Sequence, residues 1–145
     1  MAVVLSINSS RVKIYSMRYL GIDYGSKRVG IAVSDAYGKI AFPKTTFYNR
    51  GNQYLFDQLK SFIKEESTVK IIVGLPIGLD GKDSDQTKII RKFADKLKQE
   101  IGVPVDFENE MFTSHMVVEQ GVKKEHTDQA AAAVILQSYL DKQNR

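Results

Sequence analysis

The chain has 145 residues, a mass of 16.3 kDa and 43% apolar residues, which is the size and composition of one globular domain. The absence of cysteine excludes disulfide frameworks, thiolate metal sites and cysteine nucleophiles, so any metal must bind to oxygen or histidine. The longest apolar run, residues 130–136, is far shorter than the ~18 residues of a membrane span, which predicts a soluble protein without a membrane partner. The net charge of +4 fits a nucleic-acid partner and a solvated lysine face equally well.

Residues 1–16 are predicted to be an N-terminal extension that precedes a single domain at residues 17–145. The segment contains Arg11 and Lys13 but no acidic residue, and its apolar stretch is shorter than the ~7 residues of a signal-peptide core. Met17 directly opens a strong strand pattern, which favours a misassigned start over a transit peptide.

The predicted elements begin with three strands and then alternate between helices and strands. Short turns such as those between the first three strands join antiparallel neighbours. The β-branched run Val69–Gly74 is typical of a central strand buried on both faces. The order predicts an α/β fold with a mixed sheet covered by helices. The expected strands are 18–23, 28–34, 40–47, 69–74 and 104–108, and the expected helices are 53–66, 86–100, 113–120 and 128–140.

Asp23 is the first candidate for chemistry, because it ends an otherwise apolar strand and is surrounded by glycines. Glycines let a backbone turn tightly or approach a ligand, and Lys27 and Arg28 follow within reach of a phosphate. The alternative is an aspartate that caps a turn. The two cations favour a functional role, and we expect them to line the mouth of a site together with Lys82.

Further carboxylates occur later in the chain. Asp106, Glu108 and Glu110 alternate along the last strand, so they project towards one side, although some belong to a solvated edge. Asp128 stands at the start of the predicted closing helix, where an aspartate commonly serves as a cap. These carboxylates matter for catalysis only if they converge with Asp23.

Three segments resemble the motifs of a known family. The opening motif is residues 21–35, the middle one is Gly74-Leu75-Pro76 with Asp80-Gly81, and the closing helix contains Gln137-Ser138-Tyr139-Leu140. In this order and spacing they resemble the YqgF family, also called RuvX, of RNase H-like nucleases. The resemblance covers residue 17 to about residue 141.

The resemblance implies an RNase H-like fold with helices on both faces of a five-stranded mixed sheet. In that sheet strands one to three are antiparallel, the fourth lies beside the first, and strands four and five are parallel to strand one. Matched to the family's motifs, Asp23 and Asp128 are catalytic aspartates, and Glu110 is the remaining acid. All three would be the ligands of Mg²⁺ or Mn²⁺, in a mechanism in which two ions roughly 3.5–4 Å apart cleave a phosphodiester.

The resemblance also implies the biological setting. It predicts a cytoplasmic nuclease that matures the 5′ end of the 16S ribosomal RNA precursor, with Holliday-junction resolution as the alternative. Structured RNA or branched DNA would be the partner, and the protein would act as a monomer or a homodimer. In this chain Asn109 and Met111 replace an acid and a cation of the family pattern, so a binding module with weakened catalysis is a third interpretation.

An ATP-binding function is a further alternative, because Asp23-Tyr24-Gly25-Ser26 also resembles the first phosphate loop of the actin and sugar-kinase superfamily. Those proteins bind nucleotide between two lobes. One domain without a second phosphate loop argues against that function.

Overall fold

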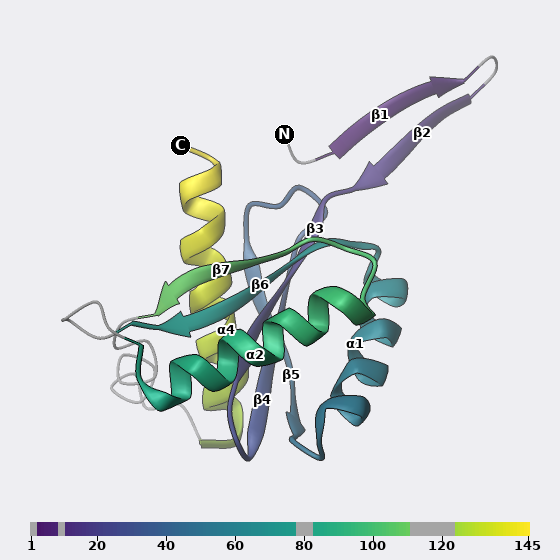
Figure 1. Cartoon of the computed structure of the whole chain (residues 1–145). Coiled ribbons are helices and arrows are strands. Elements are labelled where there is room, and N and C mark those ends of the chain that lie inside the picture. The colour runs from purple at the N-terminus through teal and green to yellow at the C-terminus, as the bar shows by residue number, and fades with distance from the viewer. Residues whose placement is uncertain (1–2, 9–10, 78–82, 111–123) are drawn as a thin grey trace.

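A computed structural model describes the backbone of residues 3–8, 11–77, 83–110 and 124–145, and side chains from residue 16 onward, except for residues 124–126 (Figure 1). The elements in chain order are β1 (Val3–Asn8), β2 (Arg11–Ser16), β3 (Arg18–Tyr24), β4 (Arg28–Ser34), β5 (Ala41–Tyr48), α1 (Asn52–Glu66), β6 (Thr68–Pro76), α2 (Asp85–Glu100), β7 (Val105–Glu110) and α4 (Lys124–Gln143).

The central sheet has five strands in the order β5-β4-β3-β6-β7. Strands β3, β4 and β5 pair antiparallel, because short turns connect them, whereas β6 and β7 run parallel to β3. The helices α1 and α2 supply the crossovers that parallel strands need. The predicted mixed sheet is therefore confirmed, with the fourth predicted strand, β6, beside the first, β3.

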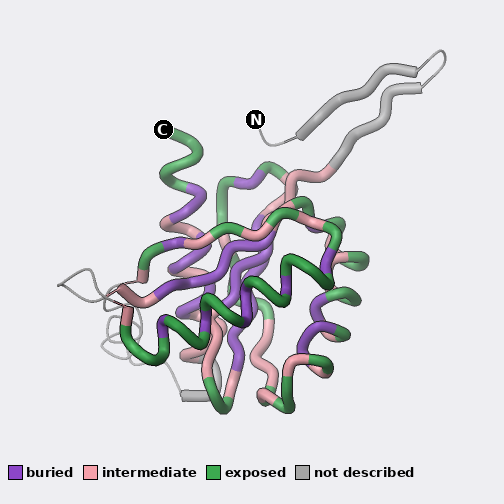
Figure 2. Tube along the Cα trace, in the orientation of Figure 1, coloured by how far each residue is buried: buried purple, intermediate pink, exposed green. Residues whose placement is uncertain are grey.

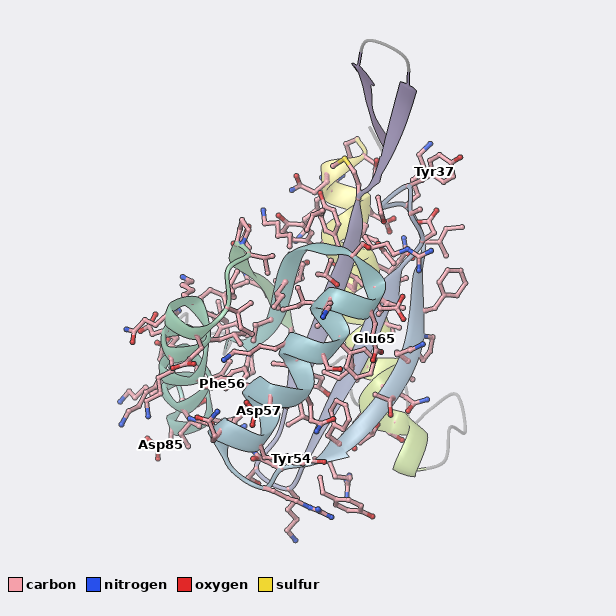
Figure 3. All side chains as sticks on the ribbon, turned by 90° about the vertical axis from the view of Figure 1, so that its right-hand side faces the viewer. Tyr37, Tyr54, Phe56, Asp57, Glu65 and Asp85 are labelled. Atoms are coloured by element: carbon pink, nitrogen blue, oxygen red, sulfur yellow. The ribbon has the colours of Figure 1, made fainter. Side chains whose placement is uncertain are left out.

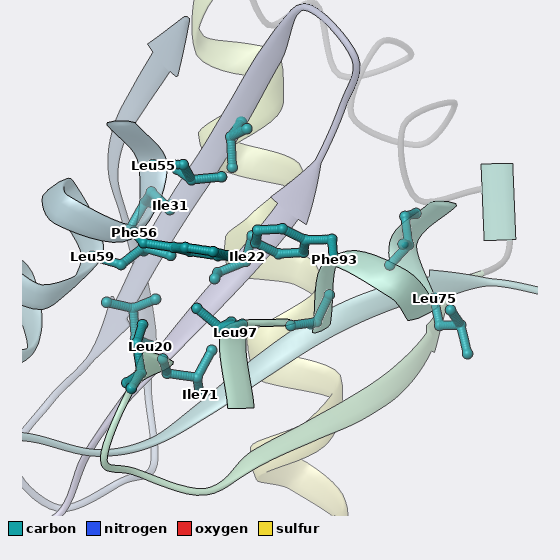
Figure 4. Close-up of a cluster of buried hydrophobic side chains, with 14 residues drawn as sticks. Leu20, Ile22, Ile31, Leu55, Phe56, Leu59, Ile71, Leu75, Phe93 and Leu97 are labelled. Atoms are coloured by element: carbon teal, nitrogen blue, oxygen red, sulfur yellow. The ribbon is translucent and has the colours of Figure 1, made fainter. Parts of the chain in front are cut away.

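Helices cover both faces of this sheet, as predicted (Figures 1 and 2). On one face, Leu20 and Ile22 of β3 pack with Phe93 and other buried residues of α1 and α2 (Figure 4). On the other face, α4 packs through small and aliphatic residues such as Ala132 and Leu136. Since side chains alternate along a strand, Asp23 shares the α4 face with Gly21.

Strand β6 is buried over a shorter stretch than the sequence pattern predicts. Its segment Ile71–Leu75 is buried on both faces between β3 and β7. Val69 is 37% exposed and Lys70 is half-buried, and the register between β3 and β6 shifts at this point, so that Val69 has no partner residue in β3. The prediction of a buried interior strand holds from Ile71 onward and is wrong for the first two residues.

The two ends of the domain differ from the expectation in detail. Helix α4 begins at Lys124, so Asp128 lies in its second turn and does not cap it as the predicted start implied. The expected helix at residues 113–120 lies outside the described residues. Strands β1 and β2 pair antiparallel in a separate two-stranded sheet, so the segment predicted as an extension contains regular strands. Over the described parts of the chain, no helix is long and apolar enough to cross a membrane.

Candidate active site

Asp23 lies at the carboxyl end of β3, on the sheet face that α4 covers. Its cross-strand partner in β4 is Gly30. A β-carbon at position 30 would overlap the main-chain carbonyl of Asp128, so only glycine lets α4 come this close to the sheet. Gly30 therefore sets Asp128 beside the strand pair that carries Asp23.

Asp128 is held by a cation from the same face. The Nε atom of Arg28 donates a hydrogen bond to Oδ2 of Asp128 at 2.6 Å, and both side chains are partly buried. This hydrogen bond and the charge of Asp128 raise the pKa of the Arg28 guanidinium above its ordinary value. The predicted phosphate-binding Arg28 is thus also a counter-ion of a predicted catalytic aspartate.

Glu110 reaches the same region from β7 by lying over Gly74 of β6, which has no side chain. Gly74 lies in β6, between β3 and β7, and a β-carbon there would stand 2.6 Å from Oε2 of Glu110. The same β-carbon would stand 2.5 Å from Cδ1 of Ile135 in α4. Because position 74 has no side chain, the Glu110 carboxylate can lie over β6 towards Asp23.

Glu110 and Asp128 lie close enough for their negative charges to act on Asp23. The pKa of Asp23 is raised from 3.8 to about 8, chiefly by burial and then by the negative charges of Glu110 and Asp128. Burial also raises the pKa of Glu110. Ionising Asp23 is therefore unfavourable. The group either keeps its proton or needs a bound cation to stabilise its charge.

The donor chemistry fits a hard divalent cation, because all three groups are carboxylates on the rim of one sheet face. Within the described ranges, however, no three His, Asp or Glu side chains are already grouped closely enough to hold an ion. The negative charge of Glu110 raises the pKa of Asp23, whereas the carboxylate of Asp128 is engaged by Arg28. Completing a three-carboxylate site would require Asp128 to exchange the guanidinium for the ion.

The remaining predicted residues lie in different places. Lys27 is exposed in the short turn between β3 and β4, at the Asp23 end of the sheet. Lys82 and Met111 lie outside the described residues. Asn109 is exposed and alternates with Glu110, which places it towards the opposite face of β7.

Glu108 has a role that its sequence pattern does not reveal. This residue is only 4% exposed, accepts a hydrogen bond from Ser138 Oγ at 2.6 Å, and pairs with Lys142 Nζ at 2.7 Å. It therefore anchors the carboxyl-terminal half of α4 to β7 and does not belong to a solvated edge. The period-two pattern predicted the face correctly, but only the packed helix shows that the carboxylate is buried.

A small cavity of about 140 Å³ lies at the other end of β3 and α4, lined by residues that include Met17, Tyr19 and Asn144. It is separated from Asp23 by the length of both elements and belongs to a different part of the surface. The carboxylates thus form a candidate site on a rim of the sheet and not in this cavity.

Comparison with known proteins agrees with the resemblance seen in the motifs. Residues 17–142 match the family model described as "RuvX: Holliday junction resolvase". A protein of Nitratidesulfovibrio vulgaris is 37% identical over 133 residues, covering 86% of this chain and 94% of the relative. A protein of Streptococcus thermophilus is 34% identical over 137 residues, covering 87% and 99% respectively. Both carry the name "Putative pre-16S rRNA nuclease".

Solved structures share the fold at low sequence identity. The RuvC protein of T. thermophilus, solved with a Holliday junction substrate, has a TM-score of 0.55 and 16% identity, covering 88% of this chain and 96% of that one. The Fowlpox virus resolvase, solved with Holliday junction DNA, has a TM-score of 0.56 and 14% identity, covering 89% and 100%. These similarities confirm the RNase H-like fold of resolvases for the sheet and helices described above.

Proposed function

The chain belongs to the RuvX family of nucleases, and from that premise we propose that it is a metal-dependent endonuclease that matures the 5′ end of the 16S ribosomal RNA precursor. The observation that supports this function most strongly is the placement of Asp23, Glu110 and Asp128 at one rim of the sheet, which Gly30 and Gly74 make possible. Such carboxylates are costly to place together unless they serve a cation. The names of the curated relatives support the RNA substrate.

Asp23, Glu110 and Asp128 would hold Mg²⁺ or Mn²⁺, whose oxygen preference they match. A bound pair of such ions supplies activation of water and stabilisation of the charge that develops on the phosphate and the leaving oxygen. The chain itself contributes the paired strand end that holds Asp23 and the space above Gly74 in which the Glu110 carboxylate lies.

The basic residues of this rim have separate tasks in the proposal. Arg28 neutralises Asp128 through its Nε hydrogen bond until an ion takes its place, and it keeps positive charge at the site. Lys27, exposed on the neighbouring turn, contacts a phosphate of the substrate strand. Lys82 is proposed to contribute a second phosphate contact, as the sequence predicts.

The exposed position of Asn109 argues against a binding module that has lost catalysis. Because Asn109 and Glu110 are consecutive in β7, their side chains point to opposite faces of the strand. An acid at position 109 would face away from Asp23, so its replacement by an amide leaves the proposed metal ligands intact.

Holliday-junction resolution is the second candidate, favoured by the description of the matching family model. Symmetric cleavage of a junction needs two sites related by a two-fold axis, whereas an RNA end can be trimmed by a monomer. We propose the RNA activity in the cytoplasm as the primary one.

The deciding experiment is a cleavage assay with precursor 16S ribosomal RNA and a synthetic four-way DNA junction in parallel. Each substrate is incubated with Mg²⁺, with Mn²⁺ and with chelator. We expect specific cleavage of the RNA that chelator abolishes, and a loss on the order of 100-fold or more in Asp23→Asn, which keeps the side-chain shape but removes its charge.

Equal cleavage by wild type and Asp23→Asn would show that the carboxylate site is not responsible. Metal-dependent cleavage of the junction alone would replace the RNA substrate by DNA. Intact substrates in every reaction, with normal binding of RNA, would favour the binding-module interpretation.

A further inference from the structure

Tyr48, the last residue of β5, is an aromatic residue that does not pack in the core. Phe47 points to the α1 face, where its ring centroid lies 5.6 Å from that of Phe62. The next residue, Tyr48, is 67% exposed. An exposed aromatic side chain at this position contributes little to packing, so its surroundings decide what it can bind.

The strand register places Tyr48 on the face that carries the candidate site. Tyr48 pairs with Arg28 across β4 and β5, and paired residues project to the same side of a sheet. Two residues earlier, Thr46 pairs with Gly30 and lies 3.3 Å, between Oγ1 and Oε1, from Gln129 of α4. Tyr48 is thus a direct neighbour of the Arg28–Asp128 pair, and Asp23 lies two strands across and two residues along, at roughly 12 Å by the usual strand dimensions.

Hydrogen bonds fix the chain around Tyr48. The backbone N–H of Asn49 donates to the carbonyl of Lys27 at 2.8 Å, and its side-chain amide donates to the carbonyl of Gly25 at 2.9 Å. The end of β5 is therefore tied to the turn between β3 and β4. Because this backbone is already fixed, a ligand that covers Tyr48 does not have to order the chain around it.

Three cationic side chains belong to the segments next to this aromatic side chain. Arg28 lies opposite Tyr48, and Lys27 lies in the turn to which Asn49 is bonded. The guanidinium carbon of Arg50 lies 5.4 Å from the centroid of the Tyr54 ring, which holds a third cation at this end of the domain. An exposed aromatic ring among cations is the combination that binds single-stranded nucleic acid by base stacking and phosphate contacts.

We propose that Tyr48 is a stacking platform for an unpaired nucleobase of the strand whose phosphate enters the carboxylate site. This inference rests on the proposed nuclease function and adds to it a preference for a single-stranded segment beside the cleaved bond. A paired base is covered by its neighbours in a duplex and offers no free face, so the platform requires an unpaired one.

The test measures binding of a fluorescein-labelled single-stranded RNA by anisotropy, in chelator so that the RNA stays intact. Tyr48→Ala should weaken binding by roughly 5- to 100-fold, the usual effect of losing one stacked base, whereas Tyr48→Phe should bind like wild type. Tyr37→Ala is the matched control, because Tyr37 is 58% exposed but lies far from Tyr48. Tyr48 is at the end of β5 that leads to Tyr54, and Figure 3 shows Tyr37 and Tyr54 at opposite ends of the domain.

A second arm identifies the ligand as a base. Abasic substitutions are moved along the RNA one position at a time. One position should weaken binding to wild type but not to Tyr48→Ala, because the ring and the base would then report one shared interaction. A stable RNA duplex of the same length should not respond to Tyr48→Ala.

The inference is wrong if Tyr48→Ala binds the single strand like wild type, if Tyr37→Ala loses as much, or if no abasic position couples to Tyr48. Normal binding by Tyr48→Ala together with loss of cleavage in Asp23→Asn would overturn the platform and leave the nuclease function standing. Weakened binding by Tyr48→Ala in a protein that cleaves nothing would support the platform and contradict the nuclease function.

Discussion

The carboxylate of Glu110 lies over Gly74, so close that a β-carbon on the glycine would stand 2.6 Å from Oε2. The two residues belong to neighbouring parallel strands, β7 and β6. Strand β6 has no carboxylate of its own at this end, since Gly74 is followed by Leu75 and Pro76. An acid from the next strand thus occupies the space that the glycine leaves open, and Gly74 becomes a requirement of the site.

In Gly74→Ala the new methyl group would meet both the Glu110 carboxylate and Ile135. We expect it to displace Glu110 and therefore to weaken the binding of Mn²⁺. The crowding should lower the free energy of unfolding by about 1–3 kcal/mol. Isothermal titration with Mn²⁺ and urea unfolding measure the two effects. Gly102→Ala is the control, because nothing lies within 4 Å of a β-carbon at that position. Unchanged Mn²⁺ affinity in Gly74→Ala would show that Glu110 is not a ligand.

The raised pKa of Asp23 predicts how stability depends on pH in the presence of chelator. The folded protein holds this proton up to about pH 8, whereas the unfolded chain releases it near 3.8. The stabilisation from this group is therefore complete below pH 3.8 and is lost as pH rises towards 8. Asp23→Asn removes that dependence, so its advantage in Tm over wild type should grow by about 5 °C or more between pH 5 and pH 8. Tm is measured against pH by thermal scans of both proteins. A constant difference in Tm between them would contradict the raised pKa of Asp23.

Lys27 should make one phosphate contact without supporting the fold. Lys27→Gln should reduce the slope of log affinity against log salt concentration by about 0.7 for a single strand, or about 0.9 for a duplex. Lys64→Gln, which removes a charge in the last turn of α1, should leave the slope unchanged. Binding measured from low to moderate salt compares the three proteins, and an unchanged slope in Lys27→Gln would place the nucleic acid on another surface.

Arg28 should behave differently from Lys27, because its guanidinium is bonded to Asp128. Arg28→Gln should tighten the binding of Mn²⁺ several-fold, since a cation that competes for the Asp128 carboxylate is removed. The same variant should also lose a phosphate contact in the salt series. Titration with Mn²⁺ in the absence of nucleic acid checks the first effect, and weaker Mn²⁺ binding would mean that Arg28 supports the ligand geometry instead.

Lys142 should matter for stability and not for cleavage. Lys142→Met leaves the buried carboxylate of Glu108 with Ser138 as its described partner, and should lower the free energy of unfolding by about 1–3 kcal/mol. Fourteen residues, roughly 21 Å of helix, separate Lys142 from Asp128, so cleavage per folded molecule should not change. Adding Glu108→Gln should recover part of the stability in urea unfolding. A cleavage defect in the folded variant would show that the anchor of α4 reaches the site.

The sequence alone determined the order of the elements from β3 onward, their approximate bounds and the antiparallel pairing of β3, β4 and β5, whereas the places of β6 and β7 in the sheet followed only from the family resemblance. Hydrophobic periodicity is a local property, and short turns restrict β3, β4 and β5 to antiparallel neighbours whatever surrounds them. The motifs around Asp23 and in the closing helix also identified the family, because their residue types and spacing are written directly in the chain.

Only the tertiary structure decided which side chains meet. Gly30 touches Asp128 and Gly74 admits Glu110 because strands and a helix far apart in sequence are packed against one another. The same packing turns Glu108 from a residue of an apparent solvated edge into a buried anchor of α4. How far a side chain is buried, and which charges act on it, depends on all the elements that pack around it. A local sequence pattern contains no information about those neighbours.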